Sequence, residues 1–210
     1  MVIDDFPQEP YEFPQDPKKI RARIRRYERL LRQEQERFGH IGDGYGKRYL
    51  LGPLYLLMGD TEGAHQSYVW YEQTFPDDSD DPLSLLCWTL VLYRVDQLQA
   101  AVAKLGQTML SNLYLLPHLL GLDQDVIDMW HPSNLAHKSY VGCIPASIFH
   151  LWEPPAIQWA DTVYHREPIR RVRESYIKID TQLKAEPRGP RRSELIQEAH
   201  QLAHSIAGSF

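Results

Sequence analysis

Residues 49–76, YLLGPLYLLMGDTEGAHQSYVWYEQTFP, decide the fold of this 210-residue chain. An apolar stretch that runs to position 58 is followed by the short polar turn Gly59-Asp60 and by a second stretch with aromatic residues at helical spacing. Pro76 cannot continue a helix, so it closes the second stretch. The pattern predicts two packed helices, near residues 47–58 and 61–75, joined by a tight turn.

Residues 81–114, DPLSLLCWTLVLYRVDQLQAAVAKLGQTMLSNLY, repeat this organisation. Ala64 and Ala101 occupy matching places, about one period apart. A helix–turn–helix unit with a period of about 30–40 residues is typical of stacked helical repeats, in which each unit buries its apolar face against the next. No segment of the sequence shows the alternation of a strand, so we predict an all-α protein.

The spacing of small and aromatic residues in the first unit resembles a tetratricopeptide repeat (TPR). The residues that carry this resemblance are Leu51-Gly52, Tyr55, Gly59, Ala64, Tyr68 and Pro76. The second unit is similar to the motif at its packing positions, which are Trp88, Leu92, Ala101 and Leu105. Two positions depart from the motif: Arg48 stands where the motif opens with Trp, and Asp96 replaces the turn glycine. The resemblance covers residues 47–115 and implies a short TPR-like pair.

A TPR pair has a concave face formed by fixed positions of the first helix of each repeat, and the resemblance implies a partner-binding groove there. Carried over onto this sequence, those positions are Tyr49, Pro53, Leu56, Leu57, Leu86, Leu90, Tyr93 and Arg94. The Lys and Asn residues with which some TPR proteins hold chaperone C-termini are absent from the set. A mostly apolar groove has to be covered, either by helices of the same chain or by an apolar segment of a partner.

The stretch before the repeats reads as one long helix over residues 17–38. Asp16 and Pro17 form an N-cap followed by proline at the first helical position, and Gly39 is a stop signal. Residues 1–16 hold five acidic residues, three prolines and no basic residue, which predicts a flexible N-terminal segment. Tyr11 and Phe13 in this segment remain candidates for docking on a groove.

The remaining half, residues 116–210, predicts further helices. Short helices broken at Pro132, Pro145 and Pro154-Pro155 are expected first, followed by amphipathic helices after Glu167 and after Pro190. We therefore expect a single all-α domain over residues 17–210.

Positive charge is concentrated in two stretches of a chain whose net charge is −5. Residues 18–37 hold nine basic and three acidic residues, and residues 166–192 hold nine basic and four acidic residues. The candidate basic surface consists of Arg25, Arg26, Arg29, Arg170, Arg171 and Arg173. If the two helices share one face, they would bind RNA, an acidic peptide or anionic lipid, although solvated outer faces of amphipathic helices also carry such charge.

No constellation in the sequence predicts a catalytic, metal or cofactor site. The loop GDGYGKR lacks the glycine spacing and the Ser or Thr of a phosphate-binding loop, so we interpret it as a connector. His200 and His204 lack a third ligand. Two of the carboxylates Asp123, Asp125 and Asp128 would act as an acid/base pair only if the fold places them in a pocket. The weaker hypothesis of an enzyme would place its site in residues 123–165.

Composition limits the class of protein. Two cysteines are too few for a disulfide scaffold, and the longest apolar run, residues 85–93, is too short to span a bilayer. We expect a cytoplasmic protein with no cofactor and no membrane partner. The favoured function is a non-enzymatic interaction or scaffold protein that binds another protein or peptide, and the alternative is a helical module that binds nucleic acid.

Overall fold

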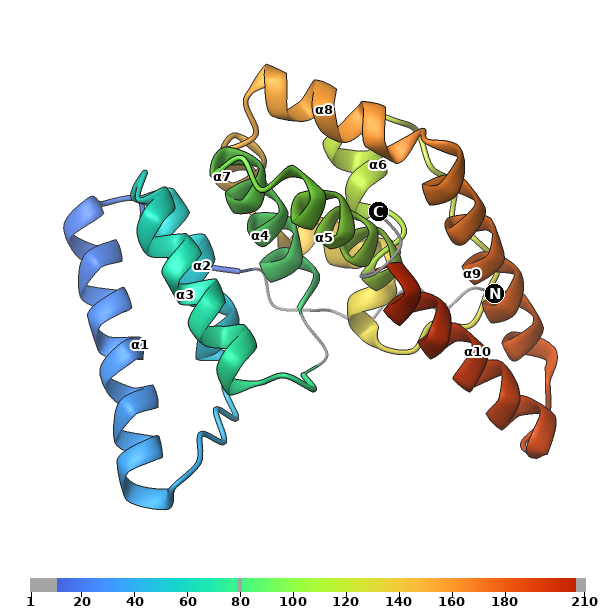
Figure 1. Cartoon of the computed structure of the whole chain (residues 1–210), viewed down its shortest axis with the longest axis horizontal. Coiled ribbons are helices and arrows are strands. Elements are labelled where there is room, and N and C mark those ends of the chain that lie inside the picture. Colours follow the sequence, from blue (N-terminus) through green and yellow to red (C-terminus); the bar gives the residue numbers. More distant parts are fainter. Residues whose placement is uncertain (1–10, 79–80, 207–210) are drawn as a thin grey trace.

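The computed structural model describes residues 11–78 and 81–206, and this part of the chain consists of helices and loops without a strand (Figure 1). The α-helices in chain order are α1 (Pro17–Phe38), α2 (Lys47–Leu57), α3 (Thr61–Thr74), α4 (Pro82–Arg94), α5 (Leu98–Ser111), α6 (Leu115–Leu119), α7 (Ala146–Phe149), α8 (Pro154–Tyr164), α9 (Glu167–Ala185) and α10 (Pro190–Ile206). Two 3₁₀ helices, η1 (Asn134–Ala136) and η2 (Lys138–Cys143), lie between α6 and α7. The prediction of an all-α fold is confirmed.

Helix α1 begins and ends where the sequence predicts. The Asp16 carboxylate accepts the backbone N–H of Lys18 at 2.8 Å, and Gly39 closes the helix in the left-handed conformation with φ of 73°. The side chains of Ile20, Ile24 and Leu31 form its buried stripe. This stripe packs on α2, which leaves the rest of α1 toward solvent at one end of the molecule (Figure 1).

Helices α2 to α5 form two consecutive helical pairs, as the repeat pattern predicts. Gly52 lies where α2 meets α3, and a Cβ atom at this position would stand 2.2 Å from the Cζ atom of Tyr68. The Tyr68 ring in turn stacks on Trp88 of α4, with ring centroids 4.8 Å apart and planes 6° from parallel. Trp88 is only 4% exposed, so the first pair is packed on the second through two aromatic rings.

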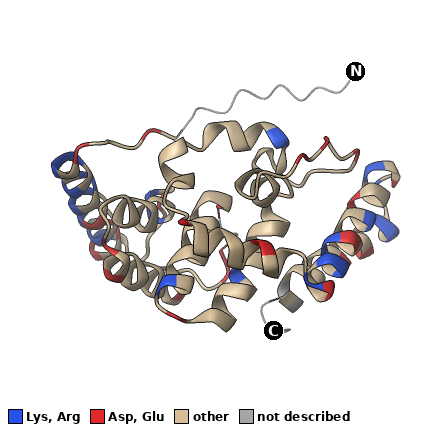
Figure 2. Ribbon diagram, turned by 90° about the horizontal axis from the view of Figure 1, so that it is seen from above, with Lys and Arg blue, Asp and Glu red and all other residues tan. Residues whose placement is uncertain are grey.

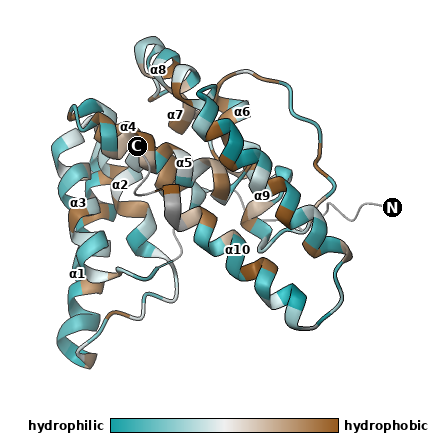
Figure 3. Cartoon of the chain, turned by 45° about the vertical axis from the view of Figure 1, so that its right-hand side comes forward, coloured by the Kyte–Doolittle hydropathy of each residue, from teal (hydrophilic) through white to brown (hydrophobic). Residues whose placement is uncertain are grey.

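Helix α4 is the centre of the hydrophobic core. Eleven of its thirteen residues are buried, and helices on both sides in the sequence cover it. Figure 3 shows hydrophobic residues gathered on α4 and α5 and hydrophilic residues along α1. A helix that is apolar on all sides has to be enclosed, and this enclosure decides what becomes of the concave face expected from the repeat resemblance.

The C-terminal half follows the predicted breaks at prolines. Helix α7 begins directly after Pro145, α8 begins at Pro154, and α9 pairs with α10. Ile206 at the end of α10 is fully buried and reaches Gly106 of α5 so closely that a Cβ there would lie 2.6 Å from its Cγ2 atom. The last helix is therefore anchored on the second repeat-like pair.

Residues 11–16 are extended and held to the domain at Tyr11. Its backbone N–H donates to the Cys143 carbonyl at 2.9 Å, and its hydroxyl donates to Asp81 Oδ2 at 2.6 Å. Asp81 is buried and caps α4 through the Ser84 N–H. The flexibility expected of residues 1–16 stays a prediction, and residues 1–10 of that segment lie outside the described residues. Cys87 and Cys143 are buried and form no disulfide within the described residues, and no described helix is long and apolar enough to cross a membrane.

Candidate partner-binding surfaces

The concave face predicted from the repeat resemblance is closed in this structure. Leu86 is fully buried, and Leu56 and Leu90 are each 1% exposed. Pro53 is buried as well, and Tyr49, Leu57, Tyr93 and Arg94 are half-buried. The groove of eight residues is therefore an interior contact of the domain.

Segments from the C-terminal half close the groove at its rim. The Tyr93 ring packs against Trp159 of α8, with centroids 5.0 Å apart, and the guanidinium of Arg94 donates to the Leu151 carbonyl at 2.7 Å. At the other end, the Tyr49 hydroxyl donates to the Asp78 carboxylate at 2.9 Å. Since these contacts occupy the side chains that a peptide would use, a partner surface has to be sought elsewhere.

The outer face of α1 carries the largest set of unpaired positive charges. Its exposed cations are Lys18, Lys19, Arg21, Arg25, Arg26, Arg29, Arg32 and Arg37. Within residues 11–78 and 81–206, no ion pair joins any of them to a carboxylate. We call this set the α1 basic face.

The carboxylates of α1 do not neutralise this face, because two of the three point toward α2. Glu28 accepts the Tyr55 hydroxyl at 2.5 Å, and Glu34 accepts the Asp43 N–H at 2.9 Å and contacts the Lys47 ammonium at 3.4 Å. The backbone hydrogen bond from Asp43 is the main reason that the pKa of Glu34 lies below its ordinary value. Glu36 alone of the three is exposed without these contacts.

The second basic stretch lies at the opposite end of the molecule, on α9 and α10 (Figure 2). Part of its charge is paired among the described residues: Arg170 and Arg171 both contact Glu167, the latter at 2.7 Å, and Lys184 and Arg191 also contact carboxylates. Arg173 donates to the neutral Gln124 at 2.6 Å. The hypothesis that Arg25, Arg26 and Arg29 share one face with Arg170, Arg171 and Arg173 is therefore wrong. The reason is that the repeat-like helices and the core lie between the two basic segments.

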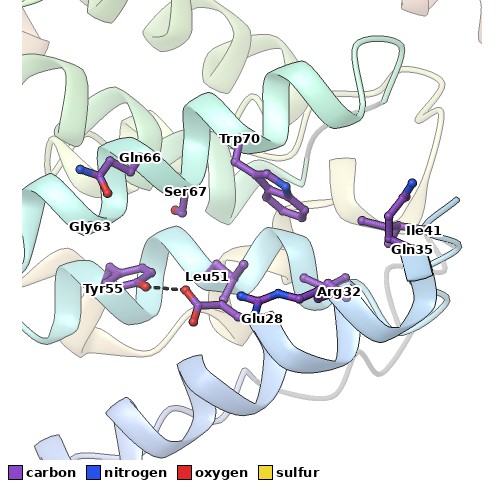
Figure 4. Close-up of a pocket in the computed structure, with 11 residues that line it drawn as sticks. Glu28, Arg32, Gln35, Ile41, Leu51, Tyr55, Gly63, Gln66, Ser67 and Trp70 are labelled. Carbon is purple, nitrogen blue, oxygen red and sulfur yellow. Dashed lines mark hydrogen bonds between the residues drawn. The ribbon is translucent and has the colours of Figure 1, made fainter. Parts of the chain in front are cut away.

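A cleft of about 380 Å³ opens beside the α1 basic face, between α1, α2 and α3 (Figure 4). Its apolar lining is formed by Leu31, Ile41, Leu51 and Trp70. Its polar lining is formed by Glu28, Arg32, Gln35, Gln66 and Ser67. The cleft thus combines an apolar floor with an open, hydrogen-bonding rim, which is the usual composition of a recognition pocket.

Two close contacts fix the shape of the cleft. Tyr55 stands against Gly63, where a Cβ atom would lie 2.6 Å from its Cδ1 atom, and the Tyr55 hydroxyl bridges to Glu28 across the helices. Burial is the first cause that raises the pKa of Tyr55, and the Glu28 carboxylate adds to it. Trp70 is held from the other side by an edge contact with Phe75, with centroids 5.8 Å apart.

The glycine-rich connector before α2 holds a buried ionic network that the sequence did not predict. Asp43 is 2% exposed, and its carboxylate accepts the Lys47 ammonium at 2.6 Å and the Arg48 N–H at 2.7 Å. The Arg48 Nε atom donates to Asp78 Oδ2 at 2.6 Å, which extends the network to Asp78. Burial alone would lower the pKa of Lys47, but Asp43 and Glu34 outweigh it and raise the pKa. The network pins the end of α1 to α2, so its role is structural.

The residues of the weaker enzyme hypothesis are not assembled into a pocket by these contacts. Asp123, Asp125 and Asp128 are exposed, and Asp128 pairs with Lys184. The rings of His131 and His137 stack with centroids 4.4 Å apart. Among the described residues, no group of three or more His, Cys, Asp or Glu side chains is placed to hold a metal ion.

Sequence reasoning singled out part of the α1 basic face but missed the cleft. Trp70 was the residue that could have indicated the cleft. It lies outside the packing positions of the TPR-like motif, so its large ring has to contact a different part of the molecule. No family model matches the chain, and neither a curated protein nor a solved structure is similar to it.

Proposed function

We propose that this protein is a non-enzymatic adaptor that binds an acidic segment of another protein through the α1 basic face. TPR-like packing of α2 to α5 would serve as the rigid support, and α1 would be the presented element. The observation that carries the proposal is the contrast between the two basic segments. The eight cations of the α1 basic face are exposed and form no ion pair within the part of the chain that the structure describes, whereas Arg170 and Arg171 at the start of α9 both contact Glu167.

Physical chemistry favours a carboxylate-rich partner for such a face. Guanidinium groups bind carboxylates with two parallel hydrogen bonds, and most of the cations on α1 are arginines. Closely spaced positive charges repel each other, so a polyanionic partner lowers their mutual repulsion. The adjoining cleft adds apolar area, which favours a protein segment over a nucleic-acid backbone.

Nucleic acid is the second candidate, because phosphates would bind the same unpaired cations. The α1 basic face supports it, but the separation of α1 from α9 reduces the surface available to one duplex or strand (Figure 2). A binding assay with both ligand classes separates the two candidates. The probes are a fluorescein-labelled poly-glutamate peptide and a single-stranded RNA of similar net charge.

A pair of charge-reversal variants locates the surface. We expect the triple variant Arg25→Glu, Arg26→Glu and Arg29→Glu to lose binding of the acidic peptide. The matched control is Arg170→Glu, Arg171→Glu and Arg173→Glu at the other end, which should retain it. Equal losses in both variants, or no binding by the wild-type protein at low salt, would contradict the proposal. Binding of RNA but not of the peptide would support the nucleic-acid candidate instead.

A further inference from the structure

The cleft beside α1 has the size and lining of a pocket for a single bulky side chain. Its volume of about 380 Å³ lies at the lower end of the range of about 300–1,000 Å³ that is typical of small-ligand pockets. Leu31 and Leu51 at its floor are 2% and 4% exposed, so the surrounding core holds both side chains in place before a ligand binds. Trp70 offers a ring for contact with another aromatic group.

The charge at the mouth of the cleft indicates which type of residue flanks the bulky side chain in the partner. Arg32 lines the cleft, is exposed, and has no ion pair or hydrogen bond among the described residues. Glu28, one turn earlier on α1, is engaged by the Tyr55 hydroxyl, as the dashed line in Figure 4 shows. The free guanidinium is thus the group at the rim that lacks a partner, and a carboxylate is its natural ligand.

We infer that the cleft receives an aromatic side chain of the acidic partner segment, while Arg32 pairs with a carboxylate of a neighbouring residue in that segment. The inference rests on the proposed function and deepens it, since the α1 basic face attracts the segment and the cleft selects its sequence. The aromatic ring would lie between Trp70 and the leucines of the floor. Peptides with acidic residues alone would bind by charge but without this anchor.

Two peptides that differ at one position test the inference: Glu-Asp-Glu-Trp-Glu-Asp-Glu and its counterpart with Ala in place of Trp. Burying an aromatic ring in an apolar cleft is expected to make the Trp peptide bind at least about tenfold more tightly. Equal affinities for the two peptides would overturn the inference and leave the proposed function intact. No binding of either peptide at low salt would overturn both.

A cleft-filling variant shows where the Trp side chain goes. Ser67 lines the cleft, and its hydroxyl bonds only the Ala64 carbonyl of its own helix, so Ser67→Phe fills the space while the charged face stays unchanged. This variant should bind both peptides with the affinity of the Ala peptide. The control Gln73→Phe adds the same ring at an exposed position of α3 outside the cleft lining and should keep the preference. Retained preference in Ser67→Phe would refute the location.

A measurement on the wild-type protein keeps the test independent of how the variant folds. Nuclear Overhauser contacts between the indole protons of the bound peptide and the methyl groups of Leu31 and Leu51 are expected. Contacts with methyl groups outside the cleft lining, in the absence of these, would place the side chain elsewhere and refute the inference. The variant Arg32→Gln should weaken the Trp and Ala peptides by a similar factor, because it removes the charge and leaves the pocket.

Discussion

Gly52 provides the sharpest test of the helix packing that supports the α1 basic face. In an exposed helix interior, Gly→Ala stabilises by about 1 kcal/mol, because glycine has the greater backbone entropy to lose. At Gly52 the added methyl group would stand 2.2 Å from Tyr68 Cζ and 2.4 Å from its hydroxyl oxygen, where ordinary contacts are 3.4–4 Å. One of the two helices or the Tyr68 ring therefore has to move by about an ångström.

The Tyr68 ring has no free space into which it could move. It is 2% exposed, stacks on Trp88, and donates its hydroxyl to the Ser84 carbonyl at 2.9 Å. Overpacking costs about 1–3 kcal/mol, and loss of the hydrogen bond adds about 1 kcal/mol. After the gain in helix propensity is subtracted, Gly52→Ala should destabilise the protein by roughly 1–3 kcal/mol.

Urea unfolding followed by circular dichroism measures this difference. Gly142→Ala is the matched control, because no atom lies within 4 Å of a Cβ built there, and it should stay within about 0.5 kcal/mol of wild type. In a Tyr68→Ala background, Gly52→Ala should become neutral or stabilising, since its steric partner is gone. A stabilising effect of Gly52→Ala in the wild-type background would refute the contact between α2 and α3.

Three further predictions concern the core and its charges. Trp88→Ala removes the ring between Tyr68 and Tyr71 and should lower the free energy of unfolding by roughly 3–5 kcal/mol in the same urea assay, whereas an unchanged transition would mean that the two pairs are not packed through it. Asp43→Asn leaves the buried Lys47 ammonium without its nearest carboxylate and should cost about 3 kcal/mol, and a neutral effect would show that the network does not hold the connector. Burial raises the pKa of Asp180 to about 6, and the Tyr176 hydroxyl offsets part of this shift. Because the carboxylate form is disfavoured in the folded protein, the free energy of unfolding should decline as pH rises from about 4 to about 6. Urea titrations across this pH range should show the decline in the wild-type protein and a flatter profile in Asp180→Asn.

Local signals in the sequence predicted the helices well. The bounds of α1 followed from Asp16, Pro17 and Gly39, because capping and backbone preferences act over a few residues. The bounds of α2 and α3 followed from the glycine-containing turn and from Pro76 in the same way. These features depend on neighbours in the chain, which is why sequence alone was sufficient for them.

The candidate surfaces depend on contacts between residues far apart in the chain, and local sequence patterns do not indicate such contacts. Leu86 and Leu90 have the same apolar character whether a partner or the protein's own core covers them, and only the fold shows that both lie in one core cluster with Ile148 and Trp152 of the C-terminal half. Likewise, nothing in the local sequence indicates that α1 and α9 lie at opposite ends, or that Glu28 and Glu34 turn inward from α1. The buried position of Asp43 depends on Lys47 and Arg48 folding over a loop that reads as a plain connector.

The most direct test of the central claim is to map the bound acidic peptide on the isotope-labelled protein by amide chemical shifts. The claim predicts that addition of Glu-Asp-Glu-Trp-Glu-Asp-Glu perturbs amides along α1 and along the cleft-lining turns of α3, at positions 63, 66, 67 and 70. Amides of α9 and α10 should remain unchanged, and the perturbations should fade as salt screens the charges. Perturbations concentrated on α9 and α10, or on the buried concave positions of α4, would contradict the claim that α1 presents the partner-binding surface.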